Sequence, residues 1–497
     1  MRRMSLVLAL IFFGSIASSH AATVKFSAHS QSCTSECNPA ESFYHAALNH
    51  DGREDLIWIP AVYDGEPLNF YVALSTADGK YTEQIEYDIP QGKCSSDTQA
   101  ISLAIGDFNG DGKADVAVVA TGGLLYLYLN SGNGSLTLSK TVYTYADCSS
   151  LGSPVAVADF NRDGKLDLAL SVNNQLQILF GNGKGAFSAG PITDLNVSQS
   201  LALGDFDGDG DADLATWAYD SGSVYVQVAY GDGTGNFPKI VETELPGTYL
   251  NLVTFGDVND DGKTDIIALS GTKKEAYIYA GSSTRQFTTH STVALANCGV
   301  DGALVADFDG NGTNDLVVPE GECGASGGPY TLDFVGHNAN GTFAAGQSIY
   351  NFAWGFTTST VVLHADANMK PDLYVSPCTD GTCEVNTTAV LLNETSGGFP
   401  TCQAPDAFIG INVCSPASGA SVASPVSFTV GAAGPTPMRD VEVWIDGAKE
   451  AEQIDGFSNY TFLNKSLSLD AGSHKVSIYA AGWDQSLVNK SFTIDVK

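Results

Sequence analysis

Basic residues are scarce in this chain of 497 residues, in which 23 Lys and Arg stand against 56 Asp and Glu, for a formal net charge of −33. Proteins that bind nucleic acid gather lysine and arginine where the phosphates lie, and no such basic patch is visible in the sequence. We therefore expect no nucleic-acid partner. Much of the negative charge falls in short recurring segments, which favours metal sites over a generally acidic surface.

Long apolar segments are also missing, since no run approaches the ~20 apolar residues that a membrane-spanning helix needs. The N-terminus carries Arg2 and Arg3, a mostly apolar core over 5–16 and a small-x-small site at 19–21. This pattern is typical of a secretion signal. We expect residues 1–21 to be a signal peptide. The mature chain should be a monomer that is secreted or held at the cell surface, without a membrane span.

Recognisable catalytic motifs are lacking too. The eight histidines are scattered, and none falls in a Ser-His-Asp or metalloprotease motif. His45, His337 and His364 lie near expected strand ends, where a hydrogen-bonded or solvent-facing histidine is the simpler interpretation. Carboxylate pairs for glycoside cleavage cannot be picked out, because predicted metal ligands dominate the acidic residues. We predict that the protein is not an enzyme.

The sequence does contain an acidic nonapeptide, residues 107–115 (DFNGDGKAD), followed by an apolar run. Oxygen-bearing side chains stand at positions one, three, five and nine, and glycine stands at position six, where a tight turn around a cation needs a positive φ. An EF-hand would place Glu at position twelve, but Val118 stands there, inside a strand-like run. The nonapeptide therefore predicts a calcium-type turn that joins two β-strands.

Four further copies follow, at 159–167, 205–213, 257–265 and 307–315, in steps of 52, 46, 52 and 50 residues. Two weaker copies flank these five. The upstream copy begins at Ala47, which has no side-chain oxygen, and keeps positions three, five, six and nine. We align the downstream copy on residues 366–372, where it is two residues short and lacks the Asp-Gly pair. The repeat predicts seven units of similar length.

Each unit holds alternating strand patterns separated by turns, which amounts to four strands in about 50 residues, as in a β-propeller blade. Seven blades can close into a ring and leave no long free edge. We predict that the strand at 23–27 pairs into the last blade near Phe399 and closes the ring. A parallel β-solenoid is the alternative, although its repeats are usually much shorter.

These nonapeptides resemble the FG-GAP repeat of integrin-α-like seven-bladed propellers, over about residues 23–405. In that family the loop binds calcium between the first two strands of a blade. The segment after Cys402 changes to short strands between turn signals and resembles bacterial Ig-like domains. The predicted fold is all-β, a seven-bladed β-propeller over 22–405 followed by a small Ig-like β-sandwich over 406–497.

About five Ca²⁺ ions are expected, held by side-chain oxygens and by the backbone carbonyl of position seven. The predicted ligand residues are Asp107, Asn109, Asp111, Lys113 and Asp115; Asp159, Asn161, Asp163, Lys165 and Asp167; Asp205, Asp207, Asp209, Asp211 and Asp213; Asp257, Asn259, Asp261, Lys263 and Asp265; and Asp307, Asp309, Asn311, Thr313 and Asp315. Asn49, Asp51 and Asp55 form a weaker candidate site in the upstream copy. The expected role of the ions is structural, because the carboxylates of an ion-free loop repel one another.

Ten cysteines in an exported chain predict disulfides. The candidate pairs are Cys33–Cys37, Cys94–Cys148, Cys298–Cys323, Cys378–Cys383 and Cys402–Cys414. Trp444 and Trp483 in the last domain could line a sugar site, but tryptophan in such a sandwich is more often part of the core.

Taken together, these patterns favour an exported, calcium-binding and non-catalytic module that recognises extracellular glycans or proteins, as in adhesion. A polysaccharide lyase or hydrolase built on the propeller is one alternative. A purely structural envelope protein is the other. The repeat itself does not decide between them, because one fold serves many functions.

Overall fold

The computed structural model describes residues 24–32, 40–60, 68–90, 100–120, 124–144, 151–197, 201–220, 223–245, 252–323, 330–338, 341–352, 360–366, 368, 370–375, 387–396, 402, 405, 409–454 and 458–497. Throughout these ranges the secondary structure is β, which confirms the predicted fold class. In the same ranges there is no helix long and apolar enough to cross a membrane. The predicted signal peptide lies outside the described residues.

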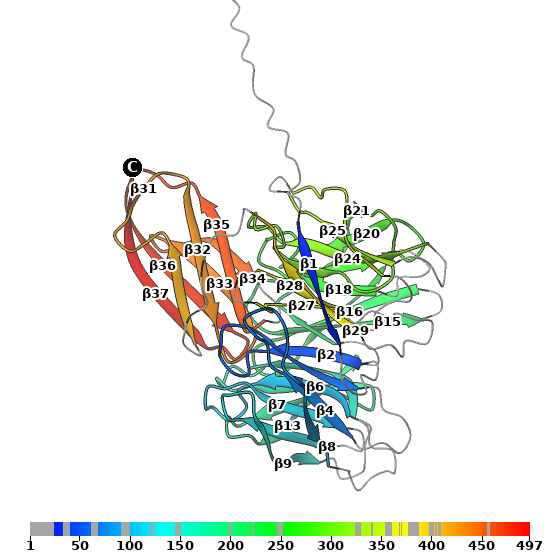
Figure 1. Cartoon of the computed structure of the whole chain (residues 1–497). Coiled ribbons are helices and arrows are strands. Elements are labelled where there is room, and N and C mark those ends of the chain that lie inside the picture. Colours follow the sequence, from blue (N-terminus) through cyan, green and yellow to red (C-terminus); the bar gives the residue numbers. More distant parts are fainter. Residues whose placement is uncertain are drawn as a thin grey trace, which may run out of the picture.

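Seven antiparallel sheets form the blades of a propeller (Figure 1). Blades 1 to 4 contain β2 (Ala40–Ala46), β3 (Asp55–Pro60), β4 (Asn69–Ala73) and β5 (Ile85–Asp88); β6 (Ala100–Gly106), β7 (Asp115–Ala120), β8 (Leu124–Asn130) and β9 (Leu136–Thr144); β10 (Leu151–Ala158), β11 (Asp167–Val172), β12 (Gln175–Gly181) and β13 (Phe187–Asn196); and β14 (Ala202–Gly204), β15 (Asp213–Asp220), β16 (Ser223–Tyr230) and β17 (Lys239–Leu245). Blades 5 to 7 contain β18 (Leu252–Gly256), β19 (Asp265–Leu269), β20 (Glu275–Tyr279) and β21 (Ser291–Ala294); β22 (Cys298–Gly299), β23 (Leu304–Ala306), β24 (Asp315–Gly321), β25 (Tyr330–Val335) and β26 (Gln347–Phe352); and β27 (Thr360–Leu363), β28 (Asp372–Val375), β29 (Thr387–Asn393) and β1 (Phe26–Ser32).

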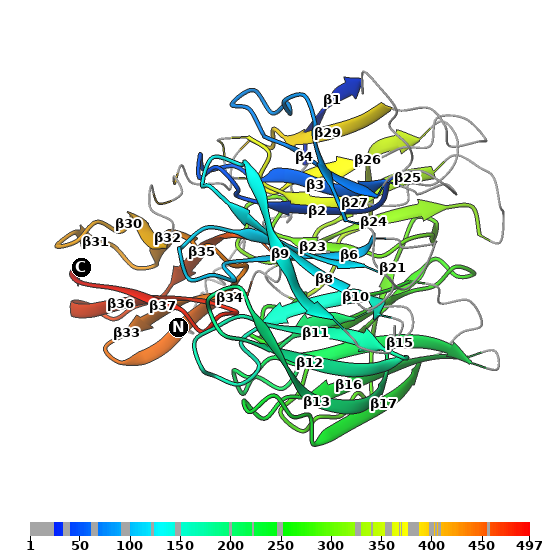
Figure 2. The same ribbon diagram turned by 90° about the horizontal axis from the view of Figure 1, so that it is seen from below.

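The first strand closes the ring, as predicted. β1 pairs antiparallel with β29, so that the N-terminal strand completes blade 7 (Figure 2). The pairing begins at Phe26 opposite Asn393, earlier in the chain than the predicted partner near Phe399, which lies outside the described residues. Because the last blade takes its outer strand from the opposite end of the described chain, separating the ring requires breaking this sheet.

Apolar side chains fill the space between neighbouring blades. One hydrophobic cluster lies between each adjacent pair, including blade 7 and blade 1, where Leu56 packs with Leu363 and Tyr374. The second strand of a blade is covered on both faces, and for this reason β7 and β11 are buried at every position. Stacking therefore buries both faces of each sheet, as the repeat requires.

The C-terminal sandwich comprises β30 (Gly410–Ser415), β31 (Ser421–Val422), β32 (Val426–Ala433), β33 (Met438–Ile445), β34 (Ala448–Ile454), β35 (Tyr460–Leu467), β36 (Gly472–Gly482) and β37 (Leu487–Val496). Its sheets have the orders β30-β32-β35 and β31-β37-β36-β33-β34, around an apolar core that includes Phe428 and Ile478. Figures 1 and 2 both show it beside the disc.

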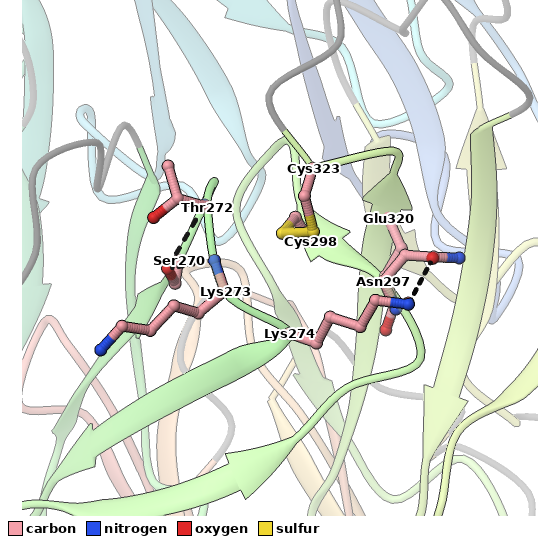
Figure 3. Close-up of a disulfide and its surroundings, with 8 residues drawn as sticks. All are labelled: Ser270, Thr272, Lys273, Lys274, Asn297, Cys298, Glu320 and Cys323. Carbon is pink, nitrogen blue, oxygen red and sulfur yellow. Dashed lines mark hydrogen bonds between the residues drawn. A yellow bond between two sulfur atoms is a disulfide. The ribbon is translucent and has the colours of Figure 1, made fainter.

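Two predicted disulfides are confirmed. Cys298–Cys323 joins β22 to the end of β24, close to Glu320 (Figure 3), and Cys402–Cys414 ties the start of the sandwich to the preceding chain. The other three predicted pairs fall on cysteines outside the described residues.

Candidate functional site

The seven nonapeptides all join the first strand of a blade to its second strand, so they lie on one face of the disc. The position-six glycines of the five intact loops have φ between 76° and 85°, the left-handed region that the sequence pattern requires. Each loop therefore adopts the tight turn expected of a calcium loop.

Position nine is an aspartate in all seven blades and acts as a buried clamp. These residues, each 0% exposed, are Asp55, Asp115, Asp167, Asp213, Asp265, Asp315 and Asp372. In every blade Oδ1 accepts a hydrogen bond of 2.7–2.9 Å from a backbone amide at the end of the third strand. In six of the seven, Oδ2 accepts one of 2.9–3.1 Å from the amide of position two. Position nine thus ties the loop to its own blade.

This clamp corrects the register of the seventh copy. Asp372 Oδ2 accepts a hydrogen bond from the amide of Ala365, seven residues earlier, which is the spacing in the other blades. The amides of Asn368 and Lys370 bond to Asp366 and Asn368, as positions five and seven do elsewhere. The copy is therefore a full nonapeptide over 364–372 with His364 at position one. The prediction of a copy two residues short was wrong, because it aligned Asp366 with the first aspartate instead of aligning the last one.

Position one gathers the amides at the tip of each intact loop. In the first, Asp107 Oδ1 accepts from Gly110 and Asp111 at 2.7 and 3.1 Å, and Oδ2 accepts from Gly112 at 2.7 Å. Asp205 and Asp307 bind the corresponding three amides of their own loops. These contacts order the tip of each loop around its position-one carboxylate.

The acidic groups converge most closely in two loops. Oxygens of Asp205, Asp207 and Asp209 lie within 4.8 Å of one another, and so do those of Asp307, Asp309 and Asp315. In the loop at 257–265, the buried Oδ1 of Asn259 makes no hydrogen bond among the described residues. Carboxylate and amide oxygens at this spacing suit Ca²⁺, and the predicted ligand residues fit that ion.

Burial and mutual repulsion keep the position-nine carboxyls from ionising freely. Burial, reinforced by neighbouring carboxylates, raises the pKa of Asp115 and Asp167 to about 7 and the pKa of Asp213 and Asp315 to about 9. A bound divalent cation would reverse this tendency, because it attracts the ionised form.

The sandwich sits on the loop-bearing face, a contact that the sequence did not predict. Three of its side chains donate hydrogen bonds to loop carbonyls: Arg439 Nη1 to Gly210 O at 3.1 Å, Asn464 Nδ2 to Gly310 O at 3.1 Å, and Lys465 Nζ to Gly312 O. These carbonyls belong to positions four and six, which are not predicted ligand positions. The sandwich therefore contacts the outer backbone of the loops at 205–213 and 307–315 and leaves the predicted ligand oxygens to the loops themselves.

A buried glutamate anchors the sandwich where blades 1 and 7 meet. Glu54, 0% exposed, accepts hydrogen bonds from Ser458 Oγ at 2.8 Å and from the amide of His364 at 2.9 Å. His45 Nδ1 lies 3.1 Å from it. Burial raises the pKa of Glu54, but the two neighbouring histidines outweigh burial and hold it well below its ordinary value. Because Ser458 donates directly to Glu54, these groups do not form a Ser-His-acid relay, in which the histidine stands between the other two.

The sandwich also completes the blade-1 loop, in which Ala47 replaces the position-one aspartate. The amide of Ala47 donates to Asn459 Oδ1 at 3.4 Å. The position-six amide, Gly52, donates to the Tyr460 hydroxyl, whose pKa burial and nearby carboxylates raise. In the intact loops the position-six amide bonds to the aspartate of position one. A hydroxyl of the sandwich thus stands in for the missing carboxylate.

Between the disc and the sandwich lies an axial cavity of about 500 Å³. The first strands of all seven blades line it, largely with apolar side chains such as Leu103, Phe255 and Val361. Phe462 and Trp483 close it from the sandwich side. The sandwich thus covers this cavity on the loop-bearing face.

The singled-out histidines and tryptophans fall at contacts between elements. His45 and His364 flank Glu54, whereas His337 is 5% exposed and stacks on Phe343 with ring centroids 4.7 Å apart. Trp483 is buried as predicted, but it packs against blades 3 and 4 and not in the core of the sandwich. Trp444 donates through Nε1 to Glu442 at 2.6 Å. The structure thus assigns Trp483 to docking, a role that its sequence context did not indicate.

The family comparison agrees with this geometry. Residues 48–118, 107–170, 159–216, 205–268 and 257–318 match the FG-GAP-like repeat, and residues 410–478 match a bacterial Ig domain. No curated protein matches the sequence.

Among solved structures, a lectin of Agrocybe aegerita that recognises non-reducing terminal N-acetylglucosamine shares 14% identity over 63% of this chain and 81% of its own, with a TM-score of 0.43. BBS1N in its complex with ARL6DN shares 11% over 76% and 98%, with a TM-score of 0.46, and the Dos1 propeller 10% over 74% and 95%, with a TM-score of 0.43. Scores below 0.5 say nothing of what this protein binds. The matched repeats span more than half of the chain, which therefore belongs to the family of FG-GAP-like repeat proteins and carries a bacterial Ig domain after the propeller.

Proposed function

We propose that this protein is an exported, calcium-stabilised and non-catalytic module that recognises an extracellular glycan or protein. The observation that carries the proposal is the seating of the Ig-like sandwich on the loop-bearing face of the propeller. That face is occupied by the chain itself, so we assign ligand binding to the opposite face or the rim. Disulfides of the kind found in exported proteins support the extracellular location.

Calcium has a structural role in this proposal. Each intact loop would hold one ion through positions one, three, five and nine and the carbonyl of position seven. The ion would neutralise carboxylates that otherwise repel one another beneath the sandwich. Since the sandwich contacts the loops at 205–213 and 307–315 through their outer carbonyls, the order of these two loops also supports its docking.

The absence of catalysis is part of the proposal. The arrangement most similar to a hydrolytic centre is the group around Glu54, and it uses its serine and histidines to join the sandwich to blades 1 and 7. Ser458, His45 and His364 also line the axial cavity, but the Ser458 hydroxyl donates directly to Glu54 and is not activated through a histidine.

A glycan array probed with the full chain, combined with an assay for new reducing ends or unsaturated products, tests the function. Binding without product supports recognition, whereas product formation would show a polysaccharide-acting enzyme. A companion variant, Lys465→Ala, tests the face. It should loosen the sandwich yet leave ligand affinity unchanged, and an increase in affinity would mean that the ligand binds beneath the sandwich.

A further inference from the structure

The loop at 205–213 differs from the other four intact loops in its charge. It holds five aspartates and no basic residue, whereas three of the others carry a lysine at position seven: Lys113, Lys165 and Lys263. Two arginines from elsewhere in the chain instead pair with its carboxylates. Arg162 of the blade-3 loop pairs with Asp211, and Arg285 of blade 5 pairs with Asp207 and Asp209.

Arg285 reaches two of the predicted ligand positions at once. Its Nε pairs with Asp207, at position three, and its Nη2 lies 3.1 Å from Asp209, at position five. The Asp207 side chain is only 4% exposed and the Arg285 side chain is 32% exposed, so the pair is partly shielded from water. The lysines of the other loops each pair with a single carboxylate, that of position five. A guanidinium spans two carboxylates in a way that one ammonium does not.

The guanidinium is held in place from its other side. Arg285 Cζ lies 4.9 Å from the centre of the Tyr230 ring, and Tyr230 is 0% exposed. A cation over such a ring gains further attraction when water is excluded. Arg285 is therefore fixed between the ring and the two aspartates.

The backbone shows that arginine is an unusual choice here. The turns 181–187, 231–237 and 281–287 correspond in sequence. Each donates a backbone hydrogen bond to the position-two carbonyl of the preceding blade's loop, from Gly185, Gly235 and Ser282 respectively. Gly185 and Gly235 occupy the position of Arg285 in the first two turns, with φ of 71° and 81°. Arg285 has φ of 57°, in the left-handed region that disfavours residues with a Cβ. The contacts of its guanidinium offset that conformational cost.

We propose that Arg285 is a built-in cation that competes with calcium for the loop at 205–213, which makes this loop the weakest of the five calcium sites. The inference rests on the proposed calcium role of the loops. Calcium and the guanidinium cannot both contact Asp207 and Asp209 closely, so the ion must first displace Arg285. The partly exposed ion pair and the contact with the Tyr230 ring together should weaken calcium binding about tenfold.

Calcium titration of the chelator-treated full chain by equilibrium dialysis tests this. Arg285→Gly, which restores the residue of the corresponding turns, should tighten the weakest site about tenfold or add one ion per chain. The matched control, Lys184→Ala, removes an exposed cation from the corresponding turn of blade 3, outside the predicted ligand residues, and should change neither number. Equal, nonzero binding by the parent and Arg285→Gly would overturn the inference alone. No binding by either would overturn the calcium role and the inference together.

Thermal unfolding gives a second readout. In chelator, Arg285→Gly should melt below the parent, because five aspartates lose a cation, and calcium should raise its Tm by more than it raises that of the parent. Equal gains in Tm would contradict the competition.

Discussion

Replacing Glu54 with glutamine should release the sandwich from the disc. Glu54 accepts hydrogen bonds from Ser458 Oγ at 2.8 Å, the amide of Asn459 at 3.3 Å and the amide of His364 at 2.9 Å, and it faces His45. Glutamine keeps the shape of the side chain but replaces one of its two accepting oxygens with an NH₂ group. That NH₂ group then faces a hydrogen-bond donor, and the donor loses its acceptor. Loss of a charged acceptor costs about 1.5–3 kcal/mol, and breaking a buried pair costs about 3–5 kcal/mol. We expect a loss of about 3 kcal/mol.

The loss should be local and should depend on pH. Hydrogen exchange should rise at the start of β35 and at the end of β27, the elements next to the anchor, more than in β7 or β11. Because the folded pKa of Glu54 lies below its ordinary value of 4.5, its stabilisation is complete above pH 4.5 and is lost as the pH falls through the folded value. The difference between parent and Glu54→Gln should therefore be full at pH 7 and shrink in acid.

The control is Glu83→Gln, which removes a carboxylate from an exposed position of the same blade and should leave stability within about 0.5 kcal/mol of the parent. The reasoning fails if Glu54→Gln and Glu83→Gln have the same unfolding free energy at pH 7, or if the exchange rates next to the anchor stay at those of the parent.

Three further changes probe the loops. Chelator should lower the Tm, and calcium should restore it. Without the ion, the stability of the fold should fall as the pH rises from about 4 through 7, because the pKa of Asp115 and Asp167 is raised to about 7 in the folded state and both carboxyls stay protonated there. Thermal melts at pH 5 and 7.5, with and without calcium, would detect this fall. Asp111→Ala should remove one calcium ion per chain in equilibrium dialysis, and an unchanged count would exclude Asp111 as a ligand. Tyr460→Phe should cost about 1 kcal/mol in chemical unfolding, as one buried hydrogen bond is lost, whereas an unaltered unfolding midpoint would deny its role in the blade-1 loop.

The propeller could be predicted from the repeat because the residues that recur are also the residues that hold each loop to its blade. Position nine clamps every loop to its blade, so spacing alone counts the blades and locates the turns. The seventh copy was misaligned for the same physical reason. Its first position is His364, and only the buried clamp from Asp372 to the Ala365 amide reveals the register.

The docking of the sandwich on the disc could not be predicted from the sequence. Its contacts join residues more than 150 positions apart, and several of the partners are backbone carbonyls, which every residue possesses. Ser458, Asn459 and Tyr460 form an ordinary polar stretch until the fold carries them to the blade-1 loop. Arg285 is different, because aligning the late turns of blades 3, 4 and 5 places it opposite two glycines, and a charged residue at such a position is a visible departure.

The two weakened loops lie side by side where the chain closes its ring, since blades 1 and 7 pack together. Each lacks the position-one aspartate that gathers the amides of the intact loops. At this place the sandwich supplies the missing acceptors. Asn459 and Tyr460 accept hydrogen bonds from amides of the blade-1 loop, and Ser458 Oγ lies within hydrogen-bond distance of both Glu54 and His364. No other adjacent pair of loops lacks both position-one aspartates, so the disc offers the sandwich only one docking site of this kind. The same nonapeptide thus has two roles. It is the proposed metal turn in five blades, two of which also contact the sandwich through backbone carbonyls, and it anchors the sandwich through side chains in the two blades that close the ring.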